Sequence, residues 1–557
     1  MRIAGYVRSL LPSWADYRSV TRTWRGDIIA GITVGIVALP LALAFGVSSG
    51  AGAEAGLITA IVAGIVAAVF GGSNIQVSGP TGAMVVVLGP IVASHGVSAV
   101  ATVSLMAGIV VLGAGAAKLG RIVSYIPWPV IEGFTLGIAV IIFLQQVPAA
   151  VGSHPGSSSN AFISAVQSLT HVDVATVAWP LASVALVALI MVFAPRIHKK
   201  LPGSIIAIIV VSVIAAVSAI PLAKIGLLPS SLPTPQLPSF DPATLQALVA
   251  PALAVAALAS IESLLSARVA ASISDTGPYD ADRELVGQGL ASIASGFFGG
   301  MPATGAIART AVNLRSGGRT RLAAIVHAIV LLGVVYLATG VVSQIPLAAL
   351  SGVLMVTATR MVSVSTVRSV IGSTRSDTVV FIVTAIITVS VDLIVAVGIG
   401  IAVAAFFALR NLARSGGVHR EELPTPTQPE DEHIALFRLD GALFFGAADR
   451  MLERVTRIDN VSVVIIRMSE LQVLDATGAR VITEMIHGLE RRGITVLIKG
   501  IQAKHLRVAT RVGVITSLRH QNHLFTDLDK AVSHARSHVS RIVAASSSEA
   551  RTKNSSR

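Results

Sequence analysis

The chain has 557 residues, of which 53% are hydrophobic and only 13% are charged, and its mean hydropathy is +0.77. Soluble domains carry roughly 25% charged residues, so this composition excludes a wholly soluble protein. The net charge of +13 does not indicate a nucleic-acid partner, because the basic residues stand in short loops beside apolar segments. The absence of cysteine excludes disulfides, thiolate-bound zinc and thiol catalysis.

Apolar windows that approach the length needed to cross a bilayer, about 20 residues, follow one another from residue 27 to residue 410. We place fourteen of them, at 27–48, 55–71, 80–94, 98–117, 126–147, 174–194, 202–220, 246–272, 286–299, 304–315, 321–342, 346–363, 377–391 and 393–410. The third and tenth are short and broken by glycine and proline. The sequence therefore predicts a polytopic α-helical membrane protein whose transporter-like domain spans 27–412.

Basic residues alternate between the loops of this fourteen-span arrangement. One side holds Lys118, Arg121, Arg196, Lys199, Lys200, Arg268, Arg283, Arg315, Arg319, Arg321, Arg360, Arg368, Arg375, Arg410 and Arg414, and the other holds Lys224. Such asymmetry follows the positive-inside rule. We expect a multi-pass protein of the cell inner (plasma) membrane with both termini in the cytoplasm, including an N-terminal segment at 1–26.

Two distant segments of the sequence resemble each other. FGG at 70–72 is followed by SNIQVSGPTGAM, and FGG at 298–300 is followed by MPATGAIART. The two copies lie seven spans apart, and because seven is odd the second copy is inverted in the membrane. FGG alone is a common close-packing element of membrane helices, but the shared Thr-Gly favours a seven-plus-seven inverted repeat. Broken helices at matching places in such repeats point to a substrate site near the midplane.

Each copy contains a proline that suits the first turn of a helix, Pro80 and Pro302. The helices that follow are predicted to begin near Thr81 and Thr304. Their free N–H groups and dipoles would face a cavity and bind an anion. The groups expected there are the hydroxyls of Thr81 and Thr304 and the backbone at Gly82 and Gly305.

Two ionisable residues belong to the same region. Glu262 stands in the apolar run ALAVAALASIESLLSARVAAS, where a carboxylate is costly and marks function. It is either a coupling residue that takes up a proton or helps to bind sodium, with Ser266 one turn away, or a structural carboxylate paired to an arginine. Arg309 either supplies positive charge near the anion or snorkels at a helix end.

These residues carry a resemblance to the SulP/SLC26 family of anion transporters along nearly the whole chain. The matching stretches are GDIIAGITVGIVALPLALAFG at 26–46, VSGPTGAM at 77–84, SIESLLSARV at 260–269, GQGLASIASGFFGG at 287–300, PATGAIARTAVN at 302–313 and SGGRT at 316–320. The resemblance implies fourteen spans in core and gate subdomains (UraA-like), a homodimer, and elevator-like movement. It places the anion against Phe45, Thr81, Gly82, Ala83, Thr304, Gly305, Ala306 and Arg309.

Different stretches of the chain resemble branches of the family that carry different substrates. The run ALPLALAFGVSSGAGAEAGL is similar to the cyanobacterial bicarbonate branch, which however has Asp and Thr, its sodium-holding residues, where this chain has Glu262 and Ser266. Glu262 and Arg309 resemble the proton-coupled sulfate and dicarboxylate members instead. Many eukaryotic members have Gln where this chain has Leu41, so that polar contact is absent.

A soluble domain follows a polar, proline-containing linker at 413–432. Strand-like runs at 434–446, 461–468 and 494–500 alternate with an amphipathic helix, which indicates a small α/β domain at 433–540. It resembles a cytoplasmic STAS domain. Thr477 aligns with the phosphorylated position of anti-sigma-factor antagonists, although we favour the interpretation that Asp475 merely caps the helix and that Thr477 is inert. The tail at 541–557 is expected to be disordered.

The leading functional prediction is secondary active transport of a small inorganic anion, sulfate or bicarbonate, coupled to protons. Sodium-dependent bicarbonate symport and dicarboxylate transport are alternatives, and a channel is a further one. From another class, an anion-sensing receptor would signal through the STAS domain. We expect no enzyme activity, no metal and no cofactor beyond the coupling ion. The expected partners are the anion, the bilayer, a second copy of the chain and regulators at the STAS domain.

Overall fold

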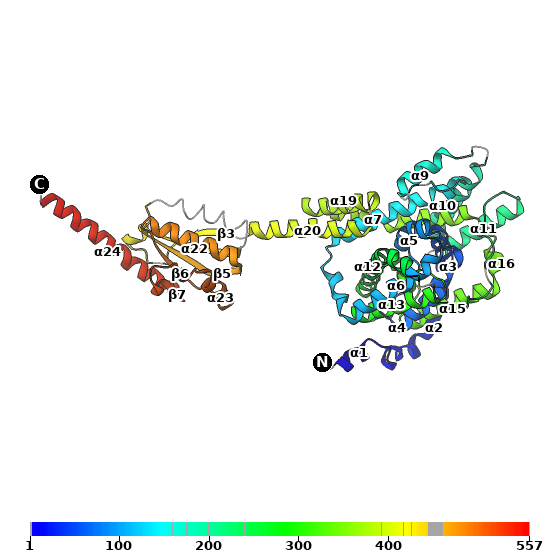
Figure 1. The fold of residues 1–557 in the computed structure, drawn as a ribbon, viewed down its shortest axis with the longest axis horizontal. Coiled ribbons are helices and arrows are strands. Elements are labelled where there is room, and N and C mark those ends of the chain that lie inside the picture. The colour runs from blue at the N-terminus through cyan, green and yellow to red at the C-terminus, as the bar shows by residue number, and fades with distance from the viewer. Residues whose placement is uncertain are drawn as a thin grey trace. The chain divides into compact units, whose positions relative to one another are not determined.

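The computed structural model describes residues 3–555 except 157, 159, 174–175, 199–200, 229, 239–240, 392, 416, 425 and 444–459. The chain divides into two compact units, Met1–Ala404 and Ala405–Arg557. We describe each unit by itself (Figure 1).

The first unit is helical apart from one pair of two-residue strands. Its elements are α1 (Ile3–Ser9), η1 (Trp14–Tyr17), α2 (Val20–Ser48), α3 (Ala53–Ile58), η2 (Thr59–Ala63), α4 (Gly64–Phe70), β1 (Ser78–Gly79), α5 (Gly82–His95), α6 (Ser98–Ala116), η3 (Leu119–Tyr125), α7 (Trp128–Gln145), α8 (Val147–Val151), α9 (Ala161–Thr170), α10 (Ala178–Ile197), α11 (Gly203–Val217), α12 (Pro242–Ser272), α13 (Ala281–Phe297), β2 (Thr304–Gly305), α14 (Ile307–Arg315), α15 (Arg321–Leu337), α16 (Thr339–Val342), α17 (Leu347–Met361), α18 (Val364–Ile371) and α19 (Arg375–Ser390), and α20 (Leu393–Ser415) begins in this unit.

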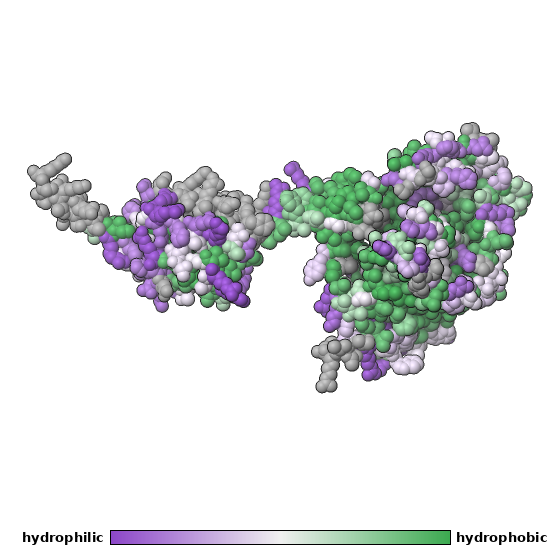
Figure 2. All heavy atoms as spheres, in the orientation of Figure 1, coloured by the Kyte–Doolittle hydropathy of each residue, from purple (hydrophilic) through white to green (hydrophobic). Residues whose placement is uncertain are grey.

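Each of the fourteen apolar windows overlaps a helix over most of its length. Among the described residues, eight helical runs are long and apolar enough to cross a membrane, and α5, α11 and α15 are among the shorter apolar helices. The polytopic helical fold is therefore confirmed, and the count of fourteen spans stays a prediction. Apolar side chains such as Ile109, Leu189 and Ile209 are exposed on this unit, and Figure 2 shows extended hydrophobic surface over its helices.

The helices pack mainly within two groups. In one group α13 packs on α4 and α6, and α15 packs on α2; in the other α19 packs on α7, and α17 packs on α10. The contact between α6 and α13 depends on glycine, because a Cβ on Gly108 would lie 2.7 Å from the Gly289 carbonyl oxygen. The groups correspond to the core subdomain (α2–α6 and α12–α15) and the gate subdomain (α7–α11 and α16–α19).

The second unit is a five-stranded sheet covered by helices on both faces. Its elements are β3 (Gly417–Glu421), η4 (Pro429–His433), β4 (Ile434–Leu443), β5 (Val463–Leu474), α22 (Ala476–Arg491), β6 (Thr495–Lys499), α23 (Ala503–Val512), η5 (Gln521–His523), β7 (Leu524–Phe525) and α24 (Leu528–Ser555). The strand order is β3-β4-β5-β6-β7, with β3 antiparallel to β4 and the other neighbours parallel. Alternating strand residues pack against α22 and α23 on one face and against α24 on the other.

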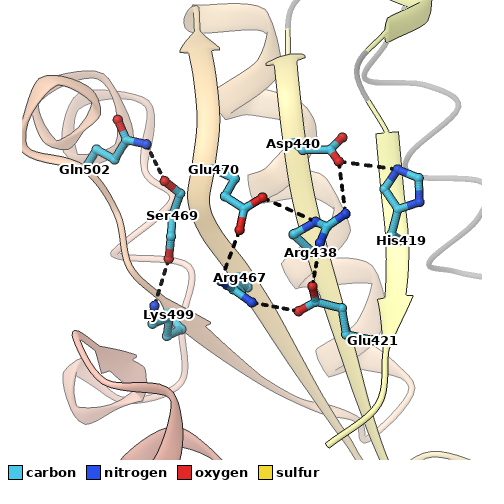
Figure 3. Close-up of polar contacts among 9 residues, drawn as sticks. All are labelled: His419, Glu421, Arg438, Asp440, Arg467, Ser469, Glu470, Lys499 and Gln502. Carbon is cyan, nitrogen blue, oxygen red and sulfur yellow. Dashed lines mark hydrogen bonds and ion pairs between the residues drawn. The ribbon is translucent and has the colours of Figure 1, made fainter.

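Two boundaries in this unit differ from the sequence prediction. The linker at 413–432 contains strand β3, whose Glu421 bridges Arg438 of β4 (2.8 Å) and Arg467 of β5 (3.0 Å) (Figure 3). These ion pairs and the β3–β4 pairing attach β3 to the sheet. The expected disordered tail is instead helical as far as Ser555, because 541–555 contain neither glycine nor proline to end α24. Part of the first predicted strand, 444–446, lies outside the described residues.

Candidate functional site

The two broken segments of the repeat meet in the first unit. Strand β1 pairs antiparallel with β2, with Ser78 opposite Gly305 and Gly79 opposite Thr304. The N–H of Ala306 extends the pairing by donating to the Val77 carbonyl oxygen at 2.9 Å. This extended backbone is buried, and its pairing satisfies polar groups that could find no water there. An antiparallel arrangement is what two inverted copies produce when their openings face each other.

The first opening forms as the sequence predicted. Helix α5 begins at Gly82 with Thr81 as its cap residue, and the Thr81 side chain does not bond the first-turn amides. Those N–H groups are therefore left for another acceptor. A Cβ on Gly82 would lie 2.2 Å from Ile142 Cδ1, so glycine lets the gate approach this helix end.

The second opening begins later than predicted. Helix α14 starts at Ile307, not near Thr304, because Thr304 and Gly305 belong to β2. The N–H of Gly305 donates to Ser263 Oγ at 3.1 Å, and that of Ala306 is used by Val77. The two amides expected to hold the anion are thus occupied within the protein, and the first turn of α14 takes their place beside the cavity.

Glu262 connects the two openings. Its Oε2 accepts the hydroxyl of Thr81 at 2.7 Å, and the Thr304 hydroxyl lies 2.8 Å from the same oxygen. The two hydroxyls are also 3.0 Å apart. Both threonines were expected to donate to the anion, and in this structure they face Glu262. Ser266 is buried one turn further on, where its hydroxyl has no hydrogen-bond partner among the described residues.

Arg309 lies inside the unit and does not snorkel. It is 2% exposed, its Nη2 donates to the Pro80 carbonyl oxygen at 2.5 Å, and its Nη1 has no partner among the described residues. A guanidinium with unused donors beside two helix openings favours the interpretation that it supplies positive charge near an anion.

A cavity of about 280 Å³ joins these groups. It is lined by Leu41, Phe45, Thr81, Gly82, Thr135, Glu262, Ala306, Ile307, Ala308, Arg309, Thr357, Arg360 and Met361. Four of the predicted site residues are not among the lining residues: Ala83, Thr304, Gly305 and Ser266. The cavity combines two guanidiniums, uncapped helix amides and one carboxylate, which suits a small anion together with a proton.

Two functional residues were missed from the sequence, Arg360 in the cavity and Glu284 at the FGG turn. Arg360 was assigned to a basic loop, yet it lines the cavity from the last turn of α17 and donates to the Met191 carbonyl oxygen at 2.5 Å. Glu284, 1% exposed, accepts the N–H groups of Gly72 (2.8 Å) and Ser73 (3.1 Å) and so holds the FGG turn. The sequence feature that could have identified Glu284 is a carboxylate directly before the apolar residues of α13.

In the second unit, Asp475 caps α22 by accepting the Gly478 N–H at 2.7 Å. Thr477 is exposed in the first turn. Its phosphorylation stays a prediction.

The same residues match a known family. Residues 24–384 match the sulfate permease family, and residues 425–531 match the STAS domain. The chain belongs to the sulfate permease family. The putative sulfate transporter YvdB of Bacillus subtilis is 33% identical over 519 residues, covering 90% of this chain and 96% of the relative. The bicarbonate transporter BicA of Synechocystis is 30% identical over 528 residues, covering 90% and 92%.

Solved structures agree with this membership. The transmembrane domain of a cyanobacterial BicA is 33% identical, covers 67% of this chain and 97% of that one, and superposes with a TM-score of 0.61. The murine anion transporter Slc26a9 in its inward-facing state is 18% identical, covers 96% and 95%, and has a TM-score of 0.82. The second likeness shows the fold, which this sulfate permease family member shares across both of its units.

Proposed function

We propose that this sulfate permease family member is a secondary active transporter that carries a small inorganic anion together with a proton. One observation carries the proposal: hydroxyls from both helix openings, Thr81 and Thr304, converge on one carboxylate oxygen of Glu262. Membership of the family supports transport, and the carboxylate gives transport a place to bind a proton.

Protonation of Glu262 would change what the cavity can bind. An ionised Glu262 accepts the two hydroxyls and repels an incoming anion across a medium of low dielectric constant. A protonated Glu262 no longer requires both donors, so the Thr81 hydroxyl is free to turn to the anion beside Arg309 and the first turn of α5. Binding of the proton then favours binding of the anion, and by linkage the anion favours the proton.

Sulfate and bicarbonate are the proposed substrates. YvdB is named as a putative sulfate transporter and BicA as a bicarbonate transporter, and uncapped amide N–H groups can donate hydrogen bonds to either anion. The second candidate is sodium-dependent bicarbonate symport, which the similarity to BicA favours, and dicarboxylate transport is a third. A carboxylate that already accepts two hydroxyls supports the proton over sodium.

The test is uptake by the purified full-length chain in liposomes. Labelled sulfate is supplied under an inward proton gradient or an inward sodium gradient, with bicarbonate, fumarate and chloride as competitors. We expect the proton gradient to drive uptake and sulfate or bicarbonate to compete most strongly. Uptake driven by sodium alone, with no response to the proton gradient, would establish the second candidate instead.

We further propose that the protein works as a homodimer in the plasma membrane, with both termini cytoplasmic and with elevator-like movement. The division of the helices into two packing groups supports movement of the core against the gate. The one-sided basic loops support the orientation. Regulators would act at the STAS domain, where Thr477 is accessible.

A further inference from the structure

Three histidines of the STAS domain lie close together beside β7, the edge strand of its sheet. His534 and His538 lie one turn apart on α24, and His523 ends η5 directly before β7. Their candidate ligand nitrogens all lie within 4.8 Å of one another. The His523 ring centroid is 5.6 Å from that of His534 and 5.5 Å from that of His538. Figure 1 shows α24 beside β7, with which it is in contact.

One nitrogen pair of the cluster has the spacing of metal coordination. The Nε2 atoms of His534 and His538 face each other at 3.2 Å. Two imidazole nitrogens bound to one tetrahedral zinc ion, each about 2.0–2.1 Å from it, lie about 3.3–3.4 Å apart. Either a direct hydrogen bond between the two imidazoles or a metal ion bound by both of them would account for this distance.

His523 distinguishes the two accounts. Its side chain is 2% exposed, and its Nδ1 is buried with no hydrogen-bond partner among the described residues. Burying a nitrogen without a hydrogen-bond partner costs free energy, and packing between the rings does not offset this cost. A metal ion held between the three rings would satisfy it.

Positive charges stand near the cluster: Arg541 acts on His534 and on His538, and Arg519 acts on His538. Because these charges oppose a cation and imidazole ligands are neutral, we expect weaker zinc binding than in thiolate sites.

We propose that His523, His534 and His538 form a binding site for a divalent transition-metal ion, Zn²⁺ in the first place. Three imidazoles leave a fourth position for water, and such a ligand set suits zinc better than calcium or magnesium. A bound ion would link α24 to the segment that leads into the edge strand β7. Nothing in the transport mechanism proposed above uses this site.

The experiment uses the full-length chain, purified through a tag without histidines and stripped of metal. Zn²⁺ is titrated against a chromogenic chelator, and Co²⁺ is added separately for its visible absorption. We expect one zinc bound per chain, more weakly than in thiolate sites, and the absorption of tetrahedral Co²⁺. His534→Ala and His538→Ala should each weaken zinc binding at least tenfold, since loss of supporting groups alone costs about 10–100-fold.

The control is His487→Ala, because His487 is exposed on α22 outside the cluster. Zinc binding should be unchanged in this variant. Equal binding by wild type and the His534→Ala and His538→Ala variants would overturn the proposal, as would an equal loss in His487→Ala. If the cluster variants fail to fold, X-ray absorption of the zinc-loaded wild type decides, because three imidazole ligands must appear.

Discussion

At Glu262 a charge and two hydrogen bonds meet on one atom. Both threonine hydroxyls approach Oε2, so the protonation state of this side chain governs which groups the openings present to the cavity. Glutamine keeps the shape and the accepting oxygen but cannot exchange a proton. The substitution therefore separates proton coupling from the architecture of the site.

We predict that Glu262→Gln removes the response of uptake to a proton gradient while anion binding stays measurable. Uptake in liposomes with and without a pH gradient, together with anion binding by calorimetry, checks this. The matched control is Glu132→Gln, because Glu132 accepts the Trp128 indole N–H at 3.0 Å on α7 and does not line the cavity. Proton-driven uptake that persists in Glu262→Gln would remove Glu262 from the coupling role.

At the scale of elements, the sequence was informative where local chemistry decides. Helix α5 begins where the Pro80–Thr81 motif predicts, although Pro80 precedes the cap residue and the Thr81 hydroxyl faces Glu262 instead of the first-turn amides. The later start of α14 could not be predicted in this way. Thr304 is drawn into β2 by a partner strand, and its hydroxyl contacts that of Thr81, 223 residues away in the sequence.

Other differences have the same kind of cause. Helix α9 is short and amphipathic, so a search for apolar windows of about 20 residues does not find it. Strand β3 was placed in a linker because its residues, GVHRE, are mostly polar, and its pairing with β4 and the ion pairs to arginines of β4 and β5 make it a strand. The orientation of Arg309 likewise depends on the Pro80 carbonyl from the other repeat.

One ion pair adds to the apolar packing that attaches helix α24 to the sheet. Arg536 donates to both Asp431 oxygens, at 2.7 Å through Nε and at 2.8 Å through Nη2. We predict that Asp431→Asn loosens α24 by about 1–2 kcal/mol, a roughly 5–30-fold loss of amide protection. Hydrogen exchange of the full chain at pH 7 measures it. Glu432→Gln, an exposed neighbour, should leave protection unchanged.

The same ion pair makes the stability of this helix depend on pH. The Arg536 guanidinium holds the pKa of Asp431 below its usual range. A carboxyl whose pKa is lower in the folded state stabilises the fold above its unfolded pKa, near 4, and this contribution disappears as the pH falls through the folded pKa. Wild-type protection of α24 at pH 3, corrected for intrinsic exchange, should therefore approach that of Asp431→Asn, which lacks this step.

At the scale of the whole molecule, hydropathy and the repeat were sufficient to predict a polytopic helical domain followed by a small α/β domain. They could not predict how the helices divide, because packing between α6 and α13 or between α7 and α19 is fixed by contacts far apart in the sequence. The division matters for function. If transport moves the core against the gate, a bond between the two groups must stop it.

The chain allows a clean test because it has no cysteine. Ser48 Oγ of the core lies 3.2 Å from Gln146 Oε1 at the end of the gate helix α7, so Ser48→Cys with Gln146→Cys provides a cross-link between the groups. We predict that a short bifunctional maleimide reduces uptake by this variant to the level of empty liposomes.

The control shares one of the two cysteines. Ser351 Oγ of α17 donates to the Gln146 carbonyl oxygen at 3.0 Å within the gate, so cross-linked Ser351→Cys with Gln146→Cys should keep its uptake. This pair experiences the same reagent and the same change at Gln146, and it differs only in whether the bond crosses from gate to core. Undiminished uptake by the cross-linked Ser48 and Gln146 variant would mean that transport proceeds while the two groups stay fixed at this contact, and the elevator proposal would then have to be abandoned.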